Sequence, residues 1–205
     1  MEIHSGGCIE CPELVAFRRQ IVLPTPCRAR GLLAIGEAPG ADEDLAGEGF
    51  VGQAGKKLHS LLASHRLERR RGYGVANLIA CRPPGNRKPS KGELGNCLGK
   101  LAAVLLDIRP KVLLLVGGSA AEAFLGRQPL SVHIERSRVS SEICASDSHP
   151  ALREAIRTLQ QGGALHVIPM PHTSGLAWNR KAPDGRMWRE VGAEQVSLAV
   201  SLLSS

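Results

Sequence analysis

The segment that most constrains the fold of this chain is an unbroken apolar run, Lys111-Val-Leu-Leu-Leu-Val116. A strand with one face in water alternates apolar and polar residues, whereas strands of a parallel sheet covered on both faces are apolar throughout. This run is therefore predicted to be a strand inside such a sheet. Three other short segments are predicted to be strands of the same sheet, at residues 31–36, 74–80 and 166–170.

Helical patterns lie between and after these strands. Apolar residues recur three or four positions apart in four segments, at residues 54–62, 93–108, 117–125 and 187–203. Strands that alternate with helices indicate an α/β fold, which we predict to be a three-layer α/β/α domain with a central, mainly parallel four-stranded sheet. The 205 residues, 43% hydrophobic and 22% charged, fit a single globular domain over 1–205. Residues 127–150 show weak periodicity and are expected to be irregular.

Three polar loops rich in glycine or proline follow strands, at residues 37–55, 81–89 and 171–180. In a parallel sheet, ligands bind beyond the carboxyl ends of the strands. The loops are therefore expected to converge at one edge of the sheet. The first of them begins with a glycine- and acid-rich stretch, residues 37–49, that is expected to be a loop throughout.

Four cysteines have the arrangement of a metal site: Cys8-x2-Cys11, then Cys81 and Cys97. A Cys-x2-Cys pair places two thiolates on one centre from a single turn, and two more thiolates complete a four-sulfur site. The N-terminal arm, residues 1–30, would supply two of the ligands. This spacing leaves zinc and an iron–sulfur cluster equally open. The remaining cysteines, Cys27 and Cys144, are expected to be structural or incidental.

The charge balance favours an anionic partner. Lys and Arg number 26 against 19 Asp and Glu, which gives a formal charge of +7, and the cations cluster at residues 66–71, 82–91 and 180–181. Such a surface attracts phosphate backbones, although a solvated basic face explains the same composition equally well. No apolar run reaches the roughly 18–20 residues that span a bilayer, and the N-terminus lacks a secretory pattern. We expect a cytoplasmic protein with no membrane partner.

Glycines punctuate two motifs, Gly36-Glu-Ala-Pro-Gly40 and Gly49-Phe-Val-Gly-Gln-Ala-Gly55, where the backbone can approach a ligand closely. The Gly-Lys-Ser/Thr ending of a P-loop is missing. Phe50, between the glycines, suits stacking on a base or anchoring a core. Asn77, near the end of a strand, suits the edge of a nucleobase or a turn. His172 follows the last strand and suits hydrogen bonding or acid–base chemistry.

Together these motifs resemble those of the family 4 uracil-DNA glycosylases. The glycine motifs with Glu43-Asp44 between them resemble the family's first motif, and Asn77-Leu-Ile-Ala-Cys-Arg-Pro-Pro-Gly-Asn-Arg-Lys-Pro89 resembles its central motif. The resemblance covers the chain from about Cys8 to Arg180. That family carries four cysteines at these places, which bind a [4Fe-4S] cluster. On this ground the resemblance favours iron–sulfur over zinc as the cofactor.

The resemblance implies excision of uracil from DNA after the base is flipped out of the stack. Phe50 would stack on uracil, and Asn77 would contact its polar edge. His172 would stabilise the leaving uracil anion by a hydrogen bond. Glu43 would stand where the methyl group of thymine would clash, and Gly40 would belong to the same base pocket.

Two departures from the pattern affect the predicted chemistry. The wider superfamily positions its water with an acidic residue of the first motif, and this chain has Ala38 there, a residue we assign to substrate binding. Glu37 or the acidic run at residues 42–44 is predicted to contribute instead. The third motif is His-Thr-Ser-Gly, whereas the family usually has His-Pro-Ser or His-Pro-Ala. Thr173 removes the fixed φ of proline, which keeps open another deaminated base, such as hypoxanthine, as the main substrate.

The predicted partner is uracil-containing DNA, double- or single-stranded. Six residues are predicted to contact it: Arg82, Arg87, Lys88, Ser174, Leu176 and Arg180. Leu176 is the candidate wedge that fills the space vacated by the flipped base. A monomer associated with the nucleoid is expected. A non-catalytic, metal-bound nucleic-acid-binding module is the remaining alternative.

Overall fold

The computed structural model describes residues 7–28, 30–140, 149–163 and 165–204. Its centre is a four-stranded sheet made of β1 (Leu32–Gly36), β2 (Tyr73–Asn77), β3 (Val112–Val116) and β4 (His166–Met170). The strand order is β2-β1-β3-β4, and all three pairings are parallel. The predicted α/β/α class and all four predicted strands are thus confirmed.

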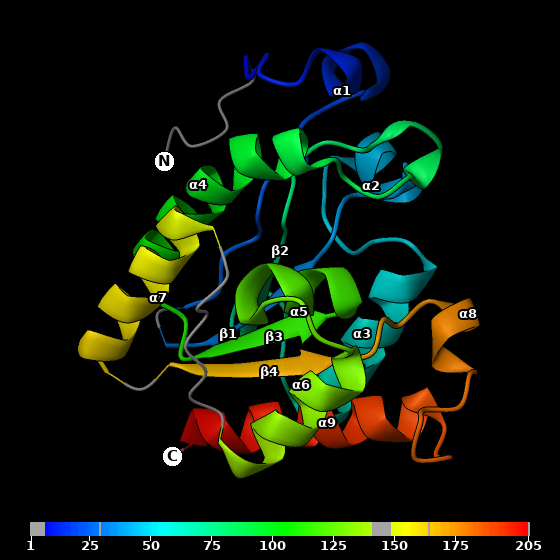
Figure 1. Ribbon diagram of the computed structural model, residues 1–205, viewed down its shortest axis with the longest axis vertical. Helices are drawn as coiled ribbons and strands as arrows, with labels where there is room; N and C mark the ends of the chain where they lie inside the picture. Colours follow the sequence, from blue (N-terminus) through cyan, green and yellow to red (C-terminus); the bar gives the residue numbers. More distant parts are fainter. Residues whose placement is uncertain (1–6, 29, 141–148, 164, 205) are drawn as a thin grey trace.

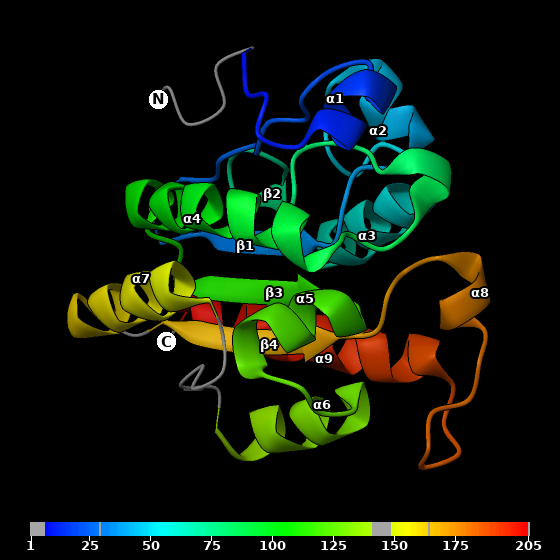
Figure 2. The ribbon, with the colours of Figure 1, turned by 45° about the horizontal axis from the view of Figure 1, so that its top comes forward.

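Helices cover both faces of the sheet (Figures 1 and 2). One face packs against α4 (Lys91–Ile108), α5 (Gly118–Leu125) and α7 (Pro150–Gln161). The other face packs against α3 (Gln53–Ser64) and α9 (Trp188–Ser204). Every residue of β3 is buried, as its apolar run predicts for a strand between two helical layers.

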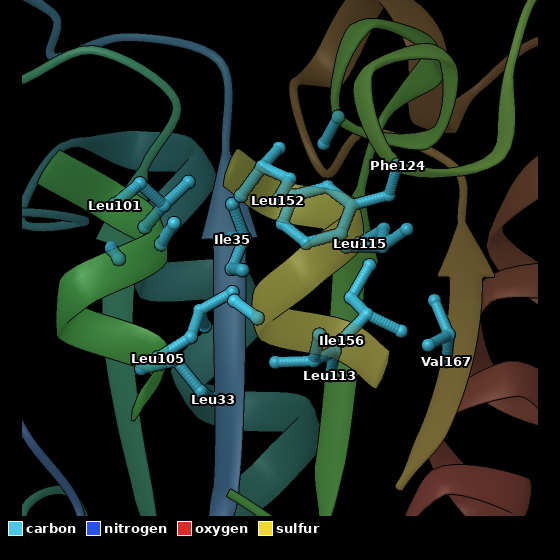
Figure 3. Packing of buried hydrophobic residues seen from close by; sticks show 14 of the residues in the cluster. Leu33, Ile35, Leu101, Leu105, Leu113, Leu115, Phe124, Leu152, Ile156 and Val167 are labelled. Carbon is cyan, nitrogen blue, oxygen red and sulfur yellow. The ribbon is translucent and has the colours of Figure 1, made fainter. Parts of the chain in front are cut away.

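The larger of the two cores lies under α4 and α7 (Figure 3). Leu33 and Ile35 of β1 and Leu113 and Leu115 of β3 project from the sheet and are fully buried. They meet the inner faces of the helices, which contribute Leu101, Leu105, Phe124, Leu152 and Ile156. Each such side chain stabilises the fold by roughly 1.5–3 kcal/mol through burial. This packing fixes the sheet from which the functional loops emerge.

Two segments expected to be irregular contain helices, so those expectations are wrong. Helix α2 (Ala41–Ala46) lies in the acid-rich stretch, and α6 (Leu130–Val139) lies within residues 127–150. The buried face of α6 carries His133 and Ser137. His133 is hydrogen-bonded to the carbonyl of Gly126, and Ser137 accepts from the side chain of Gln195. Because this inner face is partly polar, hydrophobic periodicity does not reveal the helix.

Other differences are smaller. Strand β2 ends at Asn77, three residues before the predicted end. Leu78 N still donates to Gly36 O at the end of β1, but farther on Ala80 O accepts from Val22 N of the N-terminal arm instead. Helix α7 and the short helices α1 (Pro12–Phe17) and α8 (Gly175–Trp178) lack a sequence prediction. Cys144 lies outside the described residues. No helix in the described part of the chain is long and apolar enough to cross a membrane.

A charged pair ties the loop after β2 to the first turn of α4. The guanidinium of Arg87 donates to both carboxylate oxygens of Glu93, at 2.9 and 2.7 Å. Glu93 also accepts from the amide of Ser90 at 2.7 Å, and the Ser90 hydroxyl accepts from the amide of Glu93, which makes a capping box. The hydrogen bonds from Arg87 are the main cause that lowers the pKa of Glu93 to about 2.

This pair predicts a measurable loss of stability in acid. A depressed carboxyl pKa stabilises the fold above the ordinary value of 4.5 and loses that contribution as pH falls toward 2. We expect Glu93→Gln to lower the free energy of unfolding at pH 7 by about 1–2 kcal/mol, a figure reduced for the 35% exposure of Arg87. In urea unfolding, the difference between wild type and variant in the free energy of unfolding should become smaller below pH 4.5.

The matched control is Glu68→Gln, which removes an exposed carboxylate paired with Arg71. This change is expected to alter stability by less than about 0.5 kcal/mol. If the difference in the free energy of unfolding between wild type and Glu93→Gln stays constant from pH 7 to pH 3, the stabilising role of the ionised Glu93 is contradicted.

Candidate functional site

A pocket of about 230 Å³ lies at the carboxyl edge of the sheet. Figure 2 shows α8 and the loop that precedes α4 beyond the arrowheads of the strands. The three loops that follow β1, β2 and β4 all contribute to the lining, as their positions predict. Seven residues predicted as catalytic or substrate-binding line this one cavity: Glu37, Ala38, Gly40, Glu43, Phe50, Asn77 and His172.

The floor of the pocket depends on a missing side chain at the end of β1. A Cβ at Gly36 would lie 2.6 Å from Oδ1 of Asn77 and 2.8 Å from Cζ of Phe50. Neither contact is possible for real atoms, so only glycine lets the amide and the ring meet here. Asn77 pairs with Gly36 in the parallel register of β1 and β2. Sheet register thus brings a hydrogen-bonding amide beside an aromatic ring.

Phe50 combines the two interpretations that its sequence position allows. Its side chain is 7% exposed and belongs to the core cluster under α3, while its ring also lines the pocket. The backbone is left-handed, with φ of 58°. Gly55 approaches so closely that a Cβ there would lie 2.0 Å from the Phe50 carbonyl oxygen. The glycine motif therefore shapes the backbone that carries the ring.

His172 is held as a neutral hydrogen-bond donor. The backbone amide of Ser174 donates to its Nδ1 at 3.1 Å, so the proton of the neutral ring sits on Nε2. Burial lowers the pKa of His172, and the nearby charge of Glu37 only partly opposes this effect. At neutral pH the ring can therefore donate one hydrogen bond into the pocket while it carries no charge.

The acidic residues of the first motif differ in what they contact. The carboxylate of Glu43 accepts from the amides of Gly40 at 3.0 Å and Gly52 at 2.9 Å, which joins the two halves of the motif. Asp44 is 2% exposed and accepts from the amide of Arg19 at 2.9 Å. Glu37 lines both the main pocket and a neighbouring cavity that His172 also borders. Glu37 is thus the carboxylate placed toward open space.

Thr173 joins the third motif to the first. Its side chain is 1% exposed, and its hydroxyl donates to the carbonyl of Ala54 at 2.7 Å. Ala54 lines the pocket. A proline at this position has no hydroxyl, so this chain replaces ring stiffness with a specific hydrogen bond beside His172.

The six predicted DNA-contacting residues differ in their exposure and contacts; of them, Arg87 lines the main pocket and Lys88 lines the neighbouring cavity. Arg87 is engaged by Glu93, and Arg82 donates to Asn86 at 2.8 Å and lies over the ring of Phe17. Lys88 and Arg180 are exposed. Ser174 precedes α8, and Leu176 on that helix is 73% exposed. Of the six, two cations and one apolar side chain are thus exposed.

Three residues behind the pocket were missed by sequence reasoning: His59, Arg69 and Tyr73. They contact the carbonyls of Gly49 and Phe50, directly or through one another. The available signal was the single tyrosine of the chain, whose hydroxyl needs a partner inside an otherwise apolar strand.

The cysteines predicted as ligands gather where the N-terminal arm meets the start of α4. Cys81 and Cys97 are buried with Leu14 and Ile79, and Cys11 packs against them. Burial raises the pKa of Cys81, and the charges of Cys8 and Cys11 raise it further. The pKa of Cys97 is raised to about 11, first by burial and then by the charges of Cys81 and Cys11.

Hydrogen-bond donors face three of the four sulfurs. Nη1 of Arg18 lies 2.8 Å from Sγ of Cys81, Nζ of Lys100 lies 3.1 Å from that of Cys8, and Nδ2 of Asn96 lies 3.3 Å from that of Cys11. Burial opposes ionisation of Cys8, but hydrogen bonds from the Glu10 backbone and Lys100 outweigh it and lower the pKa. Soft thiolates with charged donors suit an anionic iron–sulfur centre. Among the described residues, no group of three or more His, Cys, Asp or Glu side chains has the spacing for a single metal ion.

Fold and pocket together define a class: a doubly wound α/β protein with a small polar and aromatic pocket at the edge where its parallel strands end. Residues 25–192 match the family model of the uracil DNA glycosylase superfamily. The chain belongs to that superfamily.

Curated relatives narrow the similarity. The chain is 47% identical over 91 residues to the type-4 uracil-DNA glycosylase of Archaeoglobus fulgidus. These 91 residues make up 44% of this chain and 45% of the relative. It is 38% identical over 120 residues to that of Pyrobaculum aerophilum, covering 58% and 60%. It is 34% identical over 125 residues to that of Thermotoga maritima, covering 61% and 64%. The chain thus spans between about half and two thirds of these relatives, and the matches confirm the resemblance to the family 4 enzymes.

Thr173 yields a prediction about the stability of the site. Thr173→Val keeps the shape of the side chain but leaves the carbonyl of Ala54 without its 2.7 Å donor. We expect a loss of about 1–3 kcal/mol in the free energy of unfolding by urea. Thr173→Ser should retain most of the stability, and Thr158→Val, at an exposed site on α7, serves as the matched control. A Thr173→Val protein as stable as wild type would contradict this role.

Proposed function

We propose that this protein excises uracil from DNA and leaves an abasic site. The observation that carries the proposal is one pocket in which the Phe50 ring, the Asn77 amide and a neutral His172 donor converge. An aromatic ring can stack on a planar base, an amide can hydrogen-bond to its polar edge, and a single donor can stabilise negative charge on it. The substrate class and reaction also follow the names of the curated relatives.

Binding precedes chemistry in this mechanism. The flipped base stacks on the ring of Phe50, and the side-chain amide of Asn77 donates to and accepts from its polar edge. Glu43, fixed by the amides of Gly40 and Gly52, stands beside the base and excludes the methyl group of thymine. Ala38 and Gly40 form the wall of the base pocket.

The bond between C1′ of the sugar and N1 of uracil then breaks, and both electrons leave with the base. Negative charge develops on uracil O2, and Nε2–H of His172 donates to that oxygen. The sugar becomes oxocarbenium-like and water adds its oxygen to C1′. The proton that the water loses ends on the uracil anion, which leaves as neutral uracil. Glu37 is the carboxylate placed to orient that water, because Glu43 is occupied by backbone amides.

The same proposal assigns a [4Fe-4S] cluster to Cys8, Cys11, Cys81 and Cys97. When bound, the cluster supplies a crosslink between the arm and the loop after β2. Arg18, Lys100 and Asn96 would orient the thiolates and offset their charge. Arg18 also donates to the carbonyl of Cys8 at 2.6 Å, so one side chain contacts both ligand segments. The proposal thus places the arm, residues 1–30, in a single domain with the remainder of the chain.

DNA is proposed to lie across the mouth of the pocket. Lys88 and Arg180 would contact phosphates, joined by Arg82 and Arg87 through their exposed parts, and Ser174 would contact the backbone near α8. Leu176, exposed on α8, would fill the gap left by the flipped base. The protein would act as a monomer in the cytoplasm, at the nucleoid.

A base-release panel tests the function. Oligonucleotides that carry uracil opposite guanine, opposite adenine or in a single strand are incubated with the protein, and abasic product is measured. Release from at least one of them is expected. Release of hypoxanthine in preference to uracil would assign the alternative substrate, and DNA binding without any release would leave a binding module.

Substitutions in the pocket test the roles. His172→Ala should lower the rate by about 10²–10³, because one preorganised donor to the developing charge is lost. Asn77→Ala should lower kcat/KM by about 10–100-fold through the lost contacts to the base edge. His65→Ala, between α3 and α9, is the control and should release uracil at the wild-type rate. Wild-type rates in either pocket variant would refute its assigned role.

Removal of a proposed cluster ligand should affect stability before chemistry. Cys97→Ala is expected to lower iron content, visible absorbance, thermal midpoint and DNA affinity, while the folded fraction keeps its single-turnover rate. Cys27→Ala alters a half-buried thiol outside the ligand set and should stay brown and stable. A colourless wild-type protein that contains zinc, or a stable and fully active Cys97→Ala variant, would overturn the assignment.

A further inference from the structure

We propose that His59, supported by Tyr73 and Arg69, is a positioning residue that fixes the backbone of Phe50 and so aims its ring at the base. The inference rests on the proposed function, in which Phe50 stacks on uracil. It assigns the specificity of the pocket to a polar network behind the ring, in addition to the residues that touch the base.

The backbone of Phe50 needs such support. Its φ of 58° lies in the left-handed region, where a bulky residue is strained. A strained conformation persists only when neighbouring groups hold it. Gly55 makes room for the Phe50 carbonyl, since a Cβ there would lie 2.0 Å from the oxygen, but a glycine without a side chain provides no donor to hold it.

Two side chains provide this support through hydrogen bonds to consecutive backbone carbonyls. Nη2 of Arg69 donates to the carbonyl of Gly49 at 2.8 Å and to Oγ1 of Thr25 at 3.0 Å. Nε2 of His59 lies 2.8 Å from the carbonyl oxygen of Phe50. The peptide planes on both sides of the Phe50 Cα are therefore pinned, which fixes its φ and ψ.

The contacts of its two ring nitrogens indicate which nitrogen of His59 carries the proton. The hydroxyl of Tyr73 lies 2.5 Å from Nδ1 of His59, and the carbonyl of Phe50 can only accept. Nη1 of Arg69 also lies 3.2 Å from Nε2 and can only donate, but the shorter contact is the one to the Phe50 carbonyl. We therefore assign the proton to Nε2, which donates to Phe50, and Nδ1 accepts from the tyrosine. Burial, and next the charge of Arg69, lower the pKa of His59, which favours this neutral form. The rings of His59 and Tyr73 lie 5.7 Å apart, so the pair is also packed together.

The network reaches the pocket only through Phe50. His59, Arg69 and Tyr73 do not line the main cavity within the described residues, whereas Phe50 does. The Phe50 ring is already so close to the end of β1 that a Cβ at Gly36 would lie 2.8 Å from Cζ. A small rotation of the backbone would therefore move the ring relative to Asn77, and with it the gap that a flat base must fit.

The test uses two variants of His59 that separate its two contacts. The side-chain amide of glutamine reaches the position of Nε2, and that of asparagine reaches only the position of Nδ1. His59→Gln should keep the hydrogen-bond donor to the Phe50 carbonyl. His59→Asn should keep a partner for the Tyr73 hydroxyl but lose the hydrogen bond to the Phe50 carbonyl. We expect His59→Asn to raise KM and the inhibition constant of free uracil about tenfold, with kcat changed much less, and His59→Gln to restore both.

A double-mutant cycle separates positioning from general destabilisation. In a Phe50→Ala background the ring is gone, so His59→Asn should change KM by less than about twofold. Independent, multiplicative effects of the two substitutions would overturn the proposal, as would a His59→Gln protein as impaired as His59→Asn. Tyr73→Phe provides the same comparison where His59→Asn does not fold, because it removes only the hydroxyl.

A readout that does not need activity keeps this proposal distinct from the proposed function. The chain contains 3 phenylalanines, so the NMR signals of a labelled Phe50 ring can be assigned with Phe50→Ala. These signals should shift in His59→Asn and stay close to wild type in His59→Gln. Absence of uracil release by the wild type would refute the proposed function, whereas an unmoved Phe50 ring in His59→Asn would refute the positioning role alone.

Discussion

Parallel pairing of β1 with both β2 and β3 is the constraint on which the functional geometry depends. It places the ends of the strands at one edge of the sheet and sets Gly36 directly beside Asn77. The missing side chain of Gly36 then lets the Asn77 amide and the Phe50 ring share the space beyond β1. This register is maintained by two apolar cores, one on each face, so the precision of a polar pocket comes from hydrophobic packing elsewhere.

Polar side chains around the pocket act mainly on the backbone. Glu43 joins two glycine amides, Thr173 binds the carbonyl of Ala54, and Arg87 is paired with Glu93. The contact of Thr173 with Ala54 connects segments 119 residues apart, while those of Glu43 with Gly52 and of Arg87 with Glu93 connect neighbouring segments. The loops therefore meet as a preformed site, which reduces the ordering that binding of a base must provide. His172 and Glu37 are left facing the cavity.

Much of the fold follows from local pattern. Lys111–Val116 and the other apolar runs predict strands because a covered parallel sheet leaves no polar face. Four of the helices that cover the sheet, α3, α4, α5 and α9, are predicted from their periodicity, whereas α7 is not. The same argument fails for α6, whose buried His133 and Ser137 are satisfied by partners on Gly126 and Gln195. These partners are a backbone carbonyl and a side chain distant in sequence, and neither can be recognised from the sequence. The sequence pattern of a polar buried face is therefore the same as that of a solvent-exposed face.

The candidate site divides in the same way. Residue types and spacing by themselves determined that Phe50 and His172 lie in loops after strands, that Asn77 lies near the end of a strand, and that four cysteines stand in two distant segments. Only the tertiary structure decided that Glu43 is occupied by amides while Glu37 faces the cavity, that His172 donates from Nε2, and that His59 holds the carbonyl of Phe50. Strand formation depends on neighbours along the chain, whereas a hydrogen bond depends on angstrom-scale distances between groups that only the packed sheet brings together.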